Sequence, residues 1–180
     1  TMKDGLISNM VSASHYSRYY RKLFIGNEFG ISTLNNGKVD PVSIPKVDNA
    51  GVISIHSFQD SLLLIGSGGA GVAIYNPESR RKKMLTTHHG LASDFIYFVA
   101  ADSSGYLWIG TEKGINRLKL NTRLDIVENL HYDYDNGLTG VETNQNALYL
   151  SDDLKLFGLI DGLYQFNDLK RHGRKSFDLH

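Results

Sequence analysis

The chain has 180 residues, 19 basic and 19 acidic side chains, no cysteine, and a net charge of zero at pH 7. This length suits one domain, and the balanced charge gives no reason to expect a nucleic acid or an anionic membrane as partner. The absence of cysteine excludes disulfides, thiolate metal ligands and a cysteine nucleophile. No apolar run approaches the roughly 18 residues of a membrane-spanning helix, so we expect membrane attachment only through a longer parent chain.

Four copies of one pattern follow each other along the chain. Each has a strand-like segment that ends in glycine, at intervals of 40, 44 and 48 residues: Gly26, Gly66, Gly110 and Gly158. A short polar loop, a second glycine and another alternating segment come next in every copy. Period-two alternation predicts strands, and no segment has helical periodicity. A repeat of roughly 40–50 residues with about four short strands is typical of a β-propeller blade.

The repeats predict an all-β fold, a β-propeller of about four four-stranded blades within residues 1–167. The expected blades cover, approximately, residues 4–47, 48–87, 88–134 and 135–167, and residues 168–180 form an outer strand or a linker. Four blades leave two sheet faces uncovered. We therefore expect a fragment of a larger propeller of the seven-bladed type, or association with a second copy.

The first copy has an unusual turn. Where the third copy has Asp-Ser-Ser-Gly at residues 102–105, the first has Arg-Tyr-Tyr-Arg at residues 18–21. Exposed aromatic and arginine side chains are enriched at binding surfaces. The candidates for contact with a partner or a neighbouring domain are Tyr16, Arg18, Tyr19, Tyr20 and Arg21. Packing over the blade edges is the alternative.

Several motifs in the later copies imitate catalytic or metal sites without meeting their requirements. The glycine run at residues 66–71 precedes a strand-like segment rather than the helix that a phosphate loop opens. His88 and His89 lack a third ligand nearby, and the acidic run at residues 133–137 has its glycine in the wrong position for calcium. No Gly-x-Ser-x-Gly motif occurs. We therefore expect no catalytic residue, metal or cofactor.

A ligand site is expected at one end of the propeller. In a four-stranded blade, the loop before the first strand and the turn between the second and third strands emerge on the same face. Carboxylates, amides and histidines in these segments suit a hydroxyl-rich ligand. The candidate ligand-binding residues are Asn27, Glu28, His88, His89, Asp94, Glu112, Lys113, Glu142, Asn144 and Asp161. Each is also a common turn residue, which is the structural alternative.

The third copy, GLASDFIYFVAADSSGYLWIGTEKGINRL, resembles the two-component regulator propeller repeat. The resemblance rests on a Gly-Leu start, an Asp-x-x-Gly turn and the element Leu-Trp-Ile-Gly-Thr before a second glycine. Residues 136–167 are similar to the closing repeat of such propellers. In this family the repeats build the extracytoplasmic sensor region of membrane-bound hybrid histidine kinases that respond to glycan fragments. The resemblance thus implies a periplasmic sensor segment, with the kinase elsewhere in the parent chain.

The function expected from this resemblance is recognition of an oligosaccharide or another small polar ligand, with binding transmitted through the remaining blades and domains of the parent chain. Two alternatives belong to other classes. One is a scaffold that contacts proteins, including a second copy, without a small ligand. The other is a propeller lyase or glycosidase, which would need convergent acid and base residues that the sequence does not display.

Overall fold

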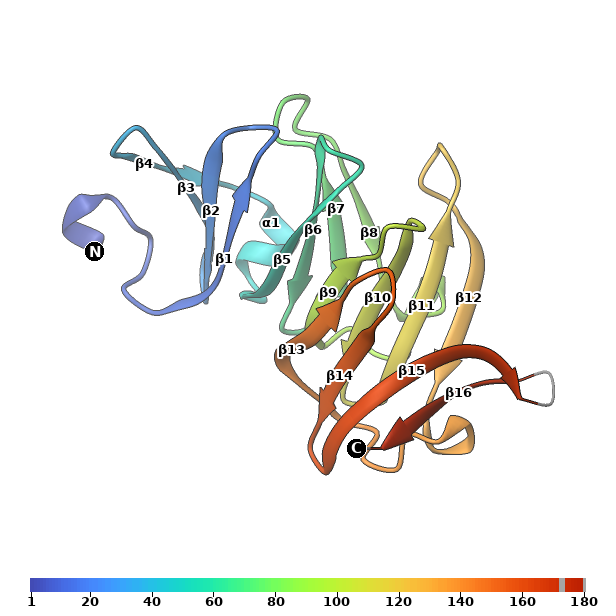
Figure 1. The fold of residues 1–180 in the computed structure, drawn as a ribbon. Helices are drawn as coiled ribbons and strands as arrows, with labels where there is room; N and C mark the ends of the chain where they lie inside the picture. Colours follow the sequence, from blue (N-terminus) through green and yellow to red (C-terminus); the bar gives the residue numbers. More distant parts are fainter. Residues whose placement is uncertain (172–173, 180) are drawn as a thin grey trace.

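The computed structural model describes residues 1–171 and 174–179, with the backbone alone from residue 168 onward. Its strands form four antiparallel sheets of four strands, and within each sheet neighbouring strands are consecutive in the chain. Figure 1 shows the sheets following one another from the blue N-terminal sheet to the red C-terminal one. The expected all-β architecture of four four-stranded blades is confirmed.

The strands of each blade are numbered from the innermost outward. Blade 1 contains β1 (Val11–Ser17), β2 (Lys22–Asn27), β3 (Gly30–Asn35) and β4 (Lys38–Val42). Blade 2 contains β5 (Val52–Phe58), β6 (Leu62–Ser67), β7 (Val72–Tyr75) and β8 (Lys82–Leu85). Blade 3 contains β9 (Ile96–Ala101), β10 (Tyr106–Thr111), β11 (Gly114–Leu120) and β12 (Ile126–Tyr132). Blade 4 contains β13 (Thr143–Leu150), β14 (Lys155–Leu159), β15 (Gly162–Arg171) and β16 (Arg174–Leu179). Within the tail at residues 168–180, residues 172–173 and 180 lie outside the described part.

Short helical turns lie in the loops between blades. They are η1 (Met2–Asp4), α1 (Pro45–Asp48), η2 (Thr87–His89) and η3 (Tyr134–Asn136). These segments are too short for helical periodicity to reveal them. The three 3-10 turns each end at the glycine of a repeated Gly-Leu pair, and these glycines have φ of 99°, 91° and 95°. Because this left-handed conformation favours glycine, the Gly-Leu pairs mark where the chain turns into a blade.

Alternating residues of the second strand of a blade pack against different neighbours. In β6, Leu63 and Ile65 belong to the apolar cluster between blades 1 and 2, whereas Leu64 belongs to the cluster between blades 2 and 3. All three side chains are fully buried. The period-two pattern of the sequence therefore builds two interfaces at once, because neighbouring side chains of a strand point to opposite sheet faces.

Trp108 packs between blades 3 and 4, as expected from its position in the repeat. Its side chain is fully buried, and its ring centroid lies 5.0 Å from that of Phe157 and 4.9 Å from that of Phe166. Its indole Nε1 donates to Asp102 Oδ2 at 2.9 Å. The guanidinium of Arg117 lies over the neighbouring Tyr106 ring, 3.7 Å from its centroid. This interface combines aromatic packing with a cation–π contact.

Two glycines of the third repeat have different reasons for lacking a side chain. Gly114 has φ of 102°, and a Cβ atom there would lie 2.1 Å from the carbonyl oxygen of Tyr132. Gly110 has no positive φ, but a Cβ atom there would lie 2.2 Å from the Phe98 ring. The first glycine is thus required by backbone conformation and space, and the second by space alone.

The inner strands meet around a common axis, where β5 contacts β1 and β9, and β13 contacts both β9 and β5. An irregularity interrupts β13 between Thr143 and Leu148, with Asn146 at φ of 53°. Asn146 Nδ2 donates to the carbonyl of Ile53 at 3.0 Å, and Gln145 Nε2 donates to that of Ser12 at 3.4 Å. Blade 4 is therefore bonded across the axis to blades 2 and 1.

Candidate functional site

The loops that lead into the blades and the turns between second and third strands lie at one end of the molecule, here called the leading-loop face. In blade 3 the two segments are joined directly, since the Ser93 hydroxyl donates to Glu112 Oε1 at 2.6 Å. The phenyl ring of Phe95 is 40% exposed on this face. In this blade, the leading loop and the turn between the second and third strands therefore lie on the same face, as expected from the strand order.

The bond from Ser93 to Glu112 has equivalents in two other blades. The Ser8 hydroxyl donates to Glu28 at 3.1 Å, and the Thr139 hydroxyl donates to Asp161 at 2.9 Å. We call each a hydroxyl–carboxylate latch: a leading-loop hydroxyl bonded to the acidic residue of the turn between second and third strands. Blade 2 has Gly68 at the position equivalent to Glu112, so it has no carboxylate for such a bond. Its Ser67 is equivalent to Thr111, and both hydroxyls donate to a glycine carbonyl across the turn, Gly71 at 2.8 Å and Gly114 at 3.0 Å. Three of the predicted carboxylates therefore hold the loops in place.

One group of two aromatic and two acidic residues extends from blade 3 to blade 4. The Tyr97 hydroxyl on β9 donates to Glu142 Oε1 at 2.8 Å, and its ring lies 5.3 Å from that of Phe95. The hydrogen bond to Glu142, burial, and the charges of Glu142 and Glu112 raise the pKa of Tyr97 above its ordinary value. Glu112 Oε2 is buried and has no hydrogen-bond partner among the described residues. The residues Phe95, Tyr97, Glu112 and Glu142 are called the blade 3–4 cluster.

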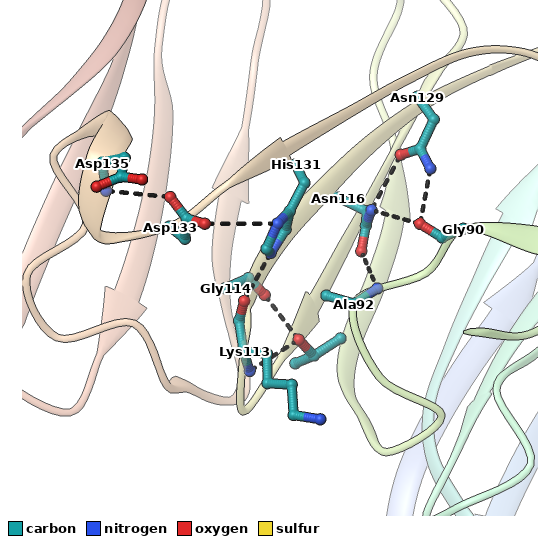
Figure 2. Close-up of polar contacts among 10 residues, drawn as sticks. Gly90, Ala92, Lys113, Gly114, Asn116, Asn129, His131, Asp133 and Asp135 are labelled. Carbon is teal, nitrogen blue, oxygen red and sulfur yellow. Dashed lines mark hydrogen bonds and ion pairs between the residues drawn. The ribbon is translucent and has the colours of Figure 1, made fainter.

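The loop that leads into blade 3 is held by two side-chain amides, the buried Asn116 and the exposed Asn129 (Figure 2). Asn116 Oδ1 accepts from the Ala92 amide at 2.9 Å, and Asn116 Nδ2 donates to the Gly90 carbonyl at 3.3 Å. Asn129 Nδ2 donates to the same carbonyl at 2.7 Å. Nearby, His131 Nε2 donates to the carbonyl of Lys113 at 2.6 Å. None of Asn116, Asn129 and His131 is among the predicted ligand-binding residues; they lie on β11 and β12, and their side chains bond to the loop backbone of the face.

The histidine pair of the third leading loop does not converge on one point. His89 Nδ1 lies 3.0 Å from the Thr86 hydroxyl and accepts from the Thr86 amide at 3.2 Å, and both histidines are exposed. Asp94 accepts from the Thr87 amide at 2.6 Å and so closes the same loop. Within the described part of the chain, no group of three or more histidine, aspartate or glutamate residues is placed to hold a metal ion.

The remaining predicted residues are distributed between turn support and solvent. Asn27 is buried and its Oδ1 accepts from the Phe29 amide at 2.8 Å, and Asn144 Nδ2 donates to the Leu159 carbonyl at 3.0 Å. The side chain of Lys113 is exposed. In blade 4, the hydrogen bonds from Tyr164 and Thr139 lower the pKa of Asp161 below its ordinary value. These residues shape the face individually rather than forming one pocket.

A cavity of about 510 Å³ opens at the axis on the leading-loop face. Exposed Met10 and Val11 from the start of blade 1 line it together with Phe95. Glu28 and Gln145 supply polar groups, and of the predicted ligand-binding residues only Glu28 lines it. Because Phe95 belongs to both, the cavity adjoins the blade 3–4 cluster.

A second cavity lies at the opposite end of the axis, among the turns that join first and second strands. This turn-end pocket has a volume of about 560 Å³ and receives residues from blades 1, 2 and 3. Tyr16, Arg18 and Tyr19, expected as partner contacts, line it. Tyr20 instead lines a groove of about 820 Å³ between blades 1 and 2, and its hydroxyl donates to the Ser61 carbonyl at 2.8 Å. Arg21 is exposed with φ of 52°.

The arrangement of four-stranded sheets around an axis defines a β-propeller. The family model described as "Two component regulator propeller" matches residues 90–113, which confirms the resemblance found in the third repeat. No curated protein sequence matches the chain. No helix in the part of the chain described by the structure has the length and apolar character needed to cross a membrane.

Solved structures show the same fold. The extracellular domain of a hybrid two component system from B. thetaiotaomicron is 22% identical, with a TM-score of 0.74, over 96% of this chain and 23% of that one. The extracellular domain of a one component system from the same organism is 16% identical, with a TM-score of 0.76, over 97% and 25%. Virginiamycin B lyase from Staphylococcus aureus is 12% identical, with a TM-score of 0.69, over 97% and 57%. The chain thus spans about a quarter of the length of the two extracellular domains.

Proposed function

We propose that this chain is a ligand-sensing segment of the periplasmic region of a two-component signalling protein, and that it binds an oligosaccharide at its leading-loop face. The matched regulator repeat and the shared fold of the bacterial extracellular domains support the sensor class. The parent chain would supply further blades, the membrane anchor and the kinase. A second copy of the chain, packed on an uncovered blade face, is a further partner in this proposal.

The side chains of the blade 3–4 cluster favour a hydroxyl-rich ligand. Its carboxylates accept hydrogen bonds, and the Tyr97 hydroxyl both donates and accepts, so that the cluster can bond to hydroxyl groups. Phe95, 40% exposed beside Tyr97, offers an apolar ring against which the C–H face of a sugar can pack.

Signalling follows from the position of the cluster across two blades. Tyr97 belongs to blade 3 and its partner Glu142 leads into blade 4. A ligand that bonds to both residues favours the packing in which the two blades are close. It therefore shifts an existing equilibrium in proportion to its preference for that packing.

Isothermal titration calorimetry with a panel of oligosaccharides tests the proposal. We expect at least one glycan to bind, and we expect Glu142→Gln and Glu112→Gln to weaken that binding by about tenfold, as loss of one charge-assisted hydrogen bond predicts. Glu78→Gln is the matched control because Glu78 is an exposed glutamate in the turn between β7 and β8, where it lines the groove between blades 1 and 2.

The same experiment separates the alternatives. An absence of binding heat for every glycan, together with an unchanged melting temperature, would rule out an oligosaccharide ligand and favour a scaffold that contacts other proteins. Turnover of a glycan, detected by chromatography of the incubated sugars, would identify an enzyme instead. In the parent chain, the bound glycan is expected to change the rate of kinase autophosphorylation.

A further inference from the structure

The turn-end pocket has several exposed side chains at its rim. Tyr16 and Tyr19 are both 56% exposed at its rim, and Arg18 and Asp60 are exposed beside them. Apart from the tyrosines, Phe58, Ala101 and Gly105, the lining residues are polar and come from the ends of β1, β5 and β9 and their following turns. A volume of about 560 Å³ lies within the ordinary range of small-molecule sites.

Part of the pocket wall is fixed before any ligand arrives. Asp102 Oδ1 accepts from the Tyr106 amide at 3.0 Å and its Oδ2 accepts from the Trp108 indole at 2.9 Å, so the carboxylate cannot rotate freely. His15 Nε2 lies 2.7 Å from the Ser57 hydroxyl. Burial, together with the charge of His56, lowers the pKa of His15, which favours its neutral form. A neutral imidazole has one donor and one acceptor nitrogen.

Several residues in the turns at the rim have a left-handed backbone conformation, which glycine adopts more readily than other residues. Gln59 and Asp60 have φ of 45° and 54°, and Arg21 has φ of 52°, whereas the equivalent turn of blade 3 uses Gly105 at φ of 74°. Left-handed backbone at other residues costs free energy and recurs at functional sites. Here the side chains retained at that cost include Gln59 and Asp60, which line the pocket.

The turn-end pocket contains both hydrogen-bond donors and acceptors, and this mixture favours one class of ligand. An anion would need mostly donors and a cation mostly acceptors, but this pocket offers the Arg18 guanidinium, the Asp60 and Asp102 carboxylates, the Gln59 amide and the Ser57 hydroxyl. A hydroxyl group donates one hydrogen bond and accepts two, so it can satisfy both kinds of partner. Two exposed tyrosine rings suit the apolar face of a pyranose ring.

We infer that the turn-end pocket is a second carbohydrate site, which takes a single sugar unit between Tyr16 and Tyr19. It shares its ligand class with the proposed function but lies at the other end of the axis and does not need the blade 3–4 cluster. A glycan bound at either end would therefore be recognised independently, and the pocket joins blades 1, 2 and 3 rather than blades 3 and 4.

Saturation-transfer NMR with D-glucose, D-galactose and N-acetyl-D-glucosamine, each offered separately to the full chain, tests the inference. We expect transfer to the ring protons of at least one sugar, with millimolar affinity. Tyr19→Ala is expected to weaken this binding by about fivefold or more, since a ring contact contributes roughly 1 kcal/mol. Tyr149→Ala is the matched control because Tyr149 is also 56% exposed, on β13 of blade 4.

The outcomes distinguish this site from the leading-loop site. Loss of transfer in Tyr19→Ala, with transfer kept in Tyr149→Ala and Glu142→Gln, supports the inference. Loss in Glu142→Gln alone places the sugar at the leading-loop face and overturns it, while the proposed function stands. No transfer from any of the three sugars to the wild-type chain also overturns it, and the oligosaccharide calorimetry then decides the proposed function separately. Because Tyr19 packs on Tyr20 with ring centroids 4.9 Å apart, Asp60→Asn repeats the test without removing a ring.

Discussion

The two ends of the propeller axis use their polar side chains in different ways. At the leading-loop face, Glu28, Glu112 and Asp161 each accept a hydrogen bond from a hydroxyl in a leading loop. At the turn-end pocket, Arg18 and Asp60 are exposed side chains of non-repeated sequence, and the Ser103 hydroxyl donates to Asp152 of the next blade. An acidic residue that recurs at equivalent positions in several blades therefore has a structural role, which is to hold a leading loop. A residue that departs from the repeat is the better candidate for binding.

The largest effect on this comparison is expected from a substitution in the turn between the second and third strands of blade 3, on the leading-loop face. Gly114→Ala places a Cβ atom 2.1 Å from the Tyr132 carbonyl at φ of 102°. We expect a loss of about 3 kcal/mol in the free energy of unfolding, from backbone strain and displacement of β12. Urea denaturation measures it.

Gly37→Ala is the control for that substitution. Gly37 also has a positive φ, 79°, but nothing lies within 4 Å of its added Cβ. It should cost only the strain, about 1 kcal/mol. Equal losses at the two glycines would show that the close approach to Tyr132 is unimportant.

The next largest effect should come from the amide that supports the leading loop of blade 3. Asn116 is fully buried, and Asn116→Ala leaves the Ala92 amide and the Gly90 carbonyl with fewer partners. We expect a loss of about 2 kcal/mol, as for an uncompensated buried polar group. Hydrogen exchange should show faster exchange at residues 90–95. Exchange that is faster throughout the chain but not selectively in this loop would contradict a local role.

A smaller effect separates the two ends directly. Ser93→Ala removes one hydroxyl–carboxylate latch and should cost about 1 kcal/mol. Ser103→Ala removes the hydrogen bond from the Ser103 hydroxyl to Asp152 of blade 4 at the turn end, and because both partners are exposed it should change the free energy of unfolding by less than about 0.5 kcal/mol. Thermal unfolding of the two variants side by side measures the difference. If Ser103→Ala were the more damaging change, the contrast between a latched end and an open end would be wrong.

The smallest expected effect is a pH dependence at the turn end. Burial lowers the pKa of both His15 and His56, whose rings lie 5.6 Å apart. The unfolded chain therefore takes up these protons first, and the free energy of unfolding should fall as pH drops below about 6.5 but not above it. Replacing both histidines with asparagine should reduce this slope in urea denaturation between pH 5.5 and 8. An unchanged slope would assign the pH dependence to other groups.

The sequence determines much of the fold because each repeat contains its own signals. Gly5, Gly90 and Gly137 mark the turns into three blades through their left-handed backbone, and alternating apolar residues mark the strands. Trp108 was expected between blades, and it packs there against Phe157. The short helical turns were not predicted, since three or four residues contain no period.

The candidate sites were only partly predictable. Strand order places the leading loops at one end, so the shared face of Ser93 and Glu112 follows from topology. That the carboxylates would be latched could have been inferred from Ser8, Ser93 and Thr139, which precede their acidic partners by about twenty residues in each case. The turn-end pocket could not be predicted in this way. Turns from three blades form this pocket, and the sequence of one repeat does not indicate which side chains the neighbouring repeats place beside it.

The bonds that cross the axis have a consequence for the order of folding. Gln145 and Ser12 are separated by 133 residues, and Asn146 and Ile53 by 93 residues. A row of blades that touch only their neighbours could grow in short steps, each closing a small loop of chain. Contacts of such long sequence separation slow the search for the native state, because their loop entropy is lost before the contacts form. We therefore expect the docking of β13 across the axis to be a late step in folding, and to couple the folding of blades 1 and 2 to that of blade 4.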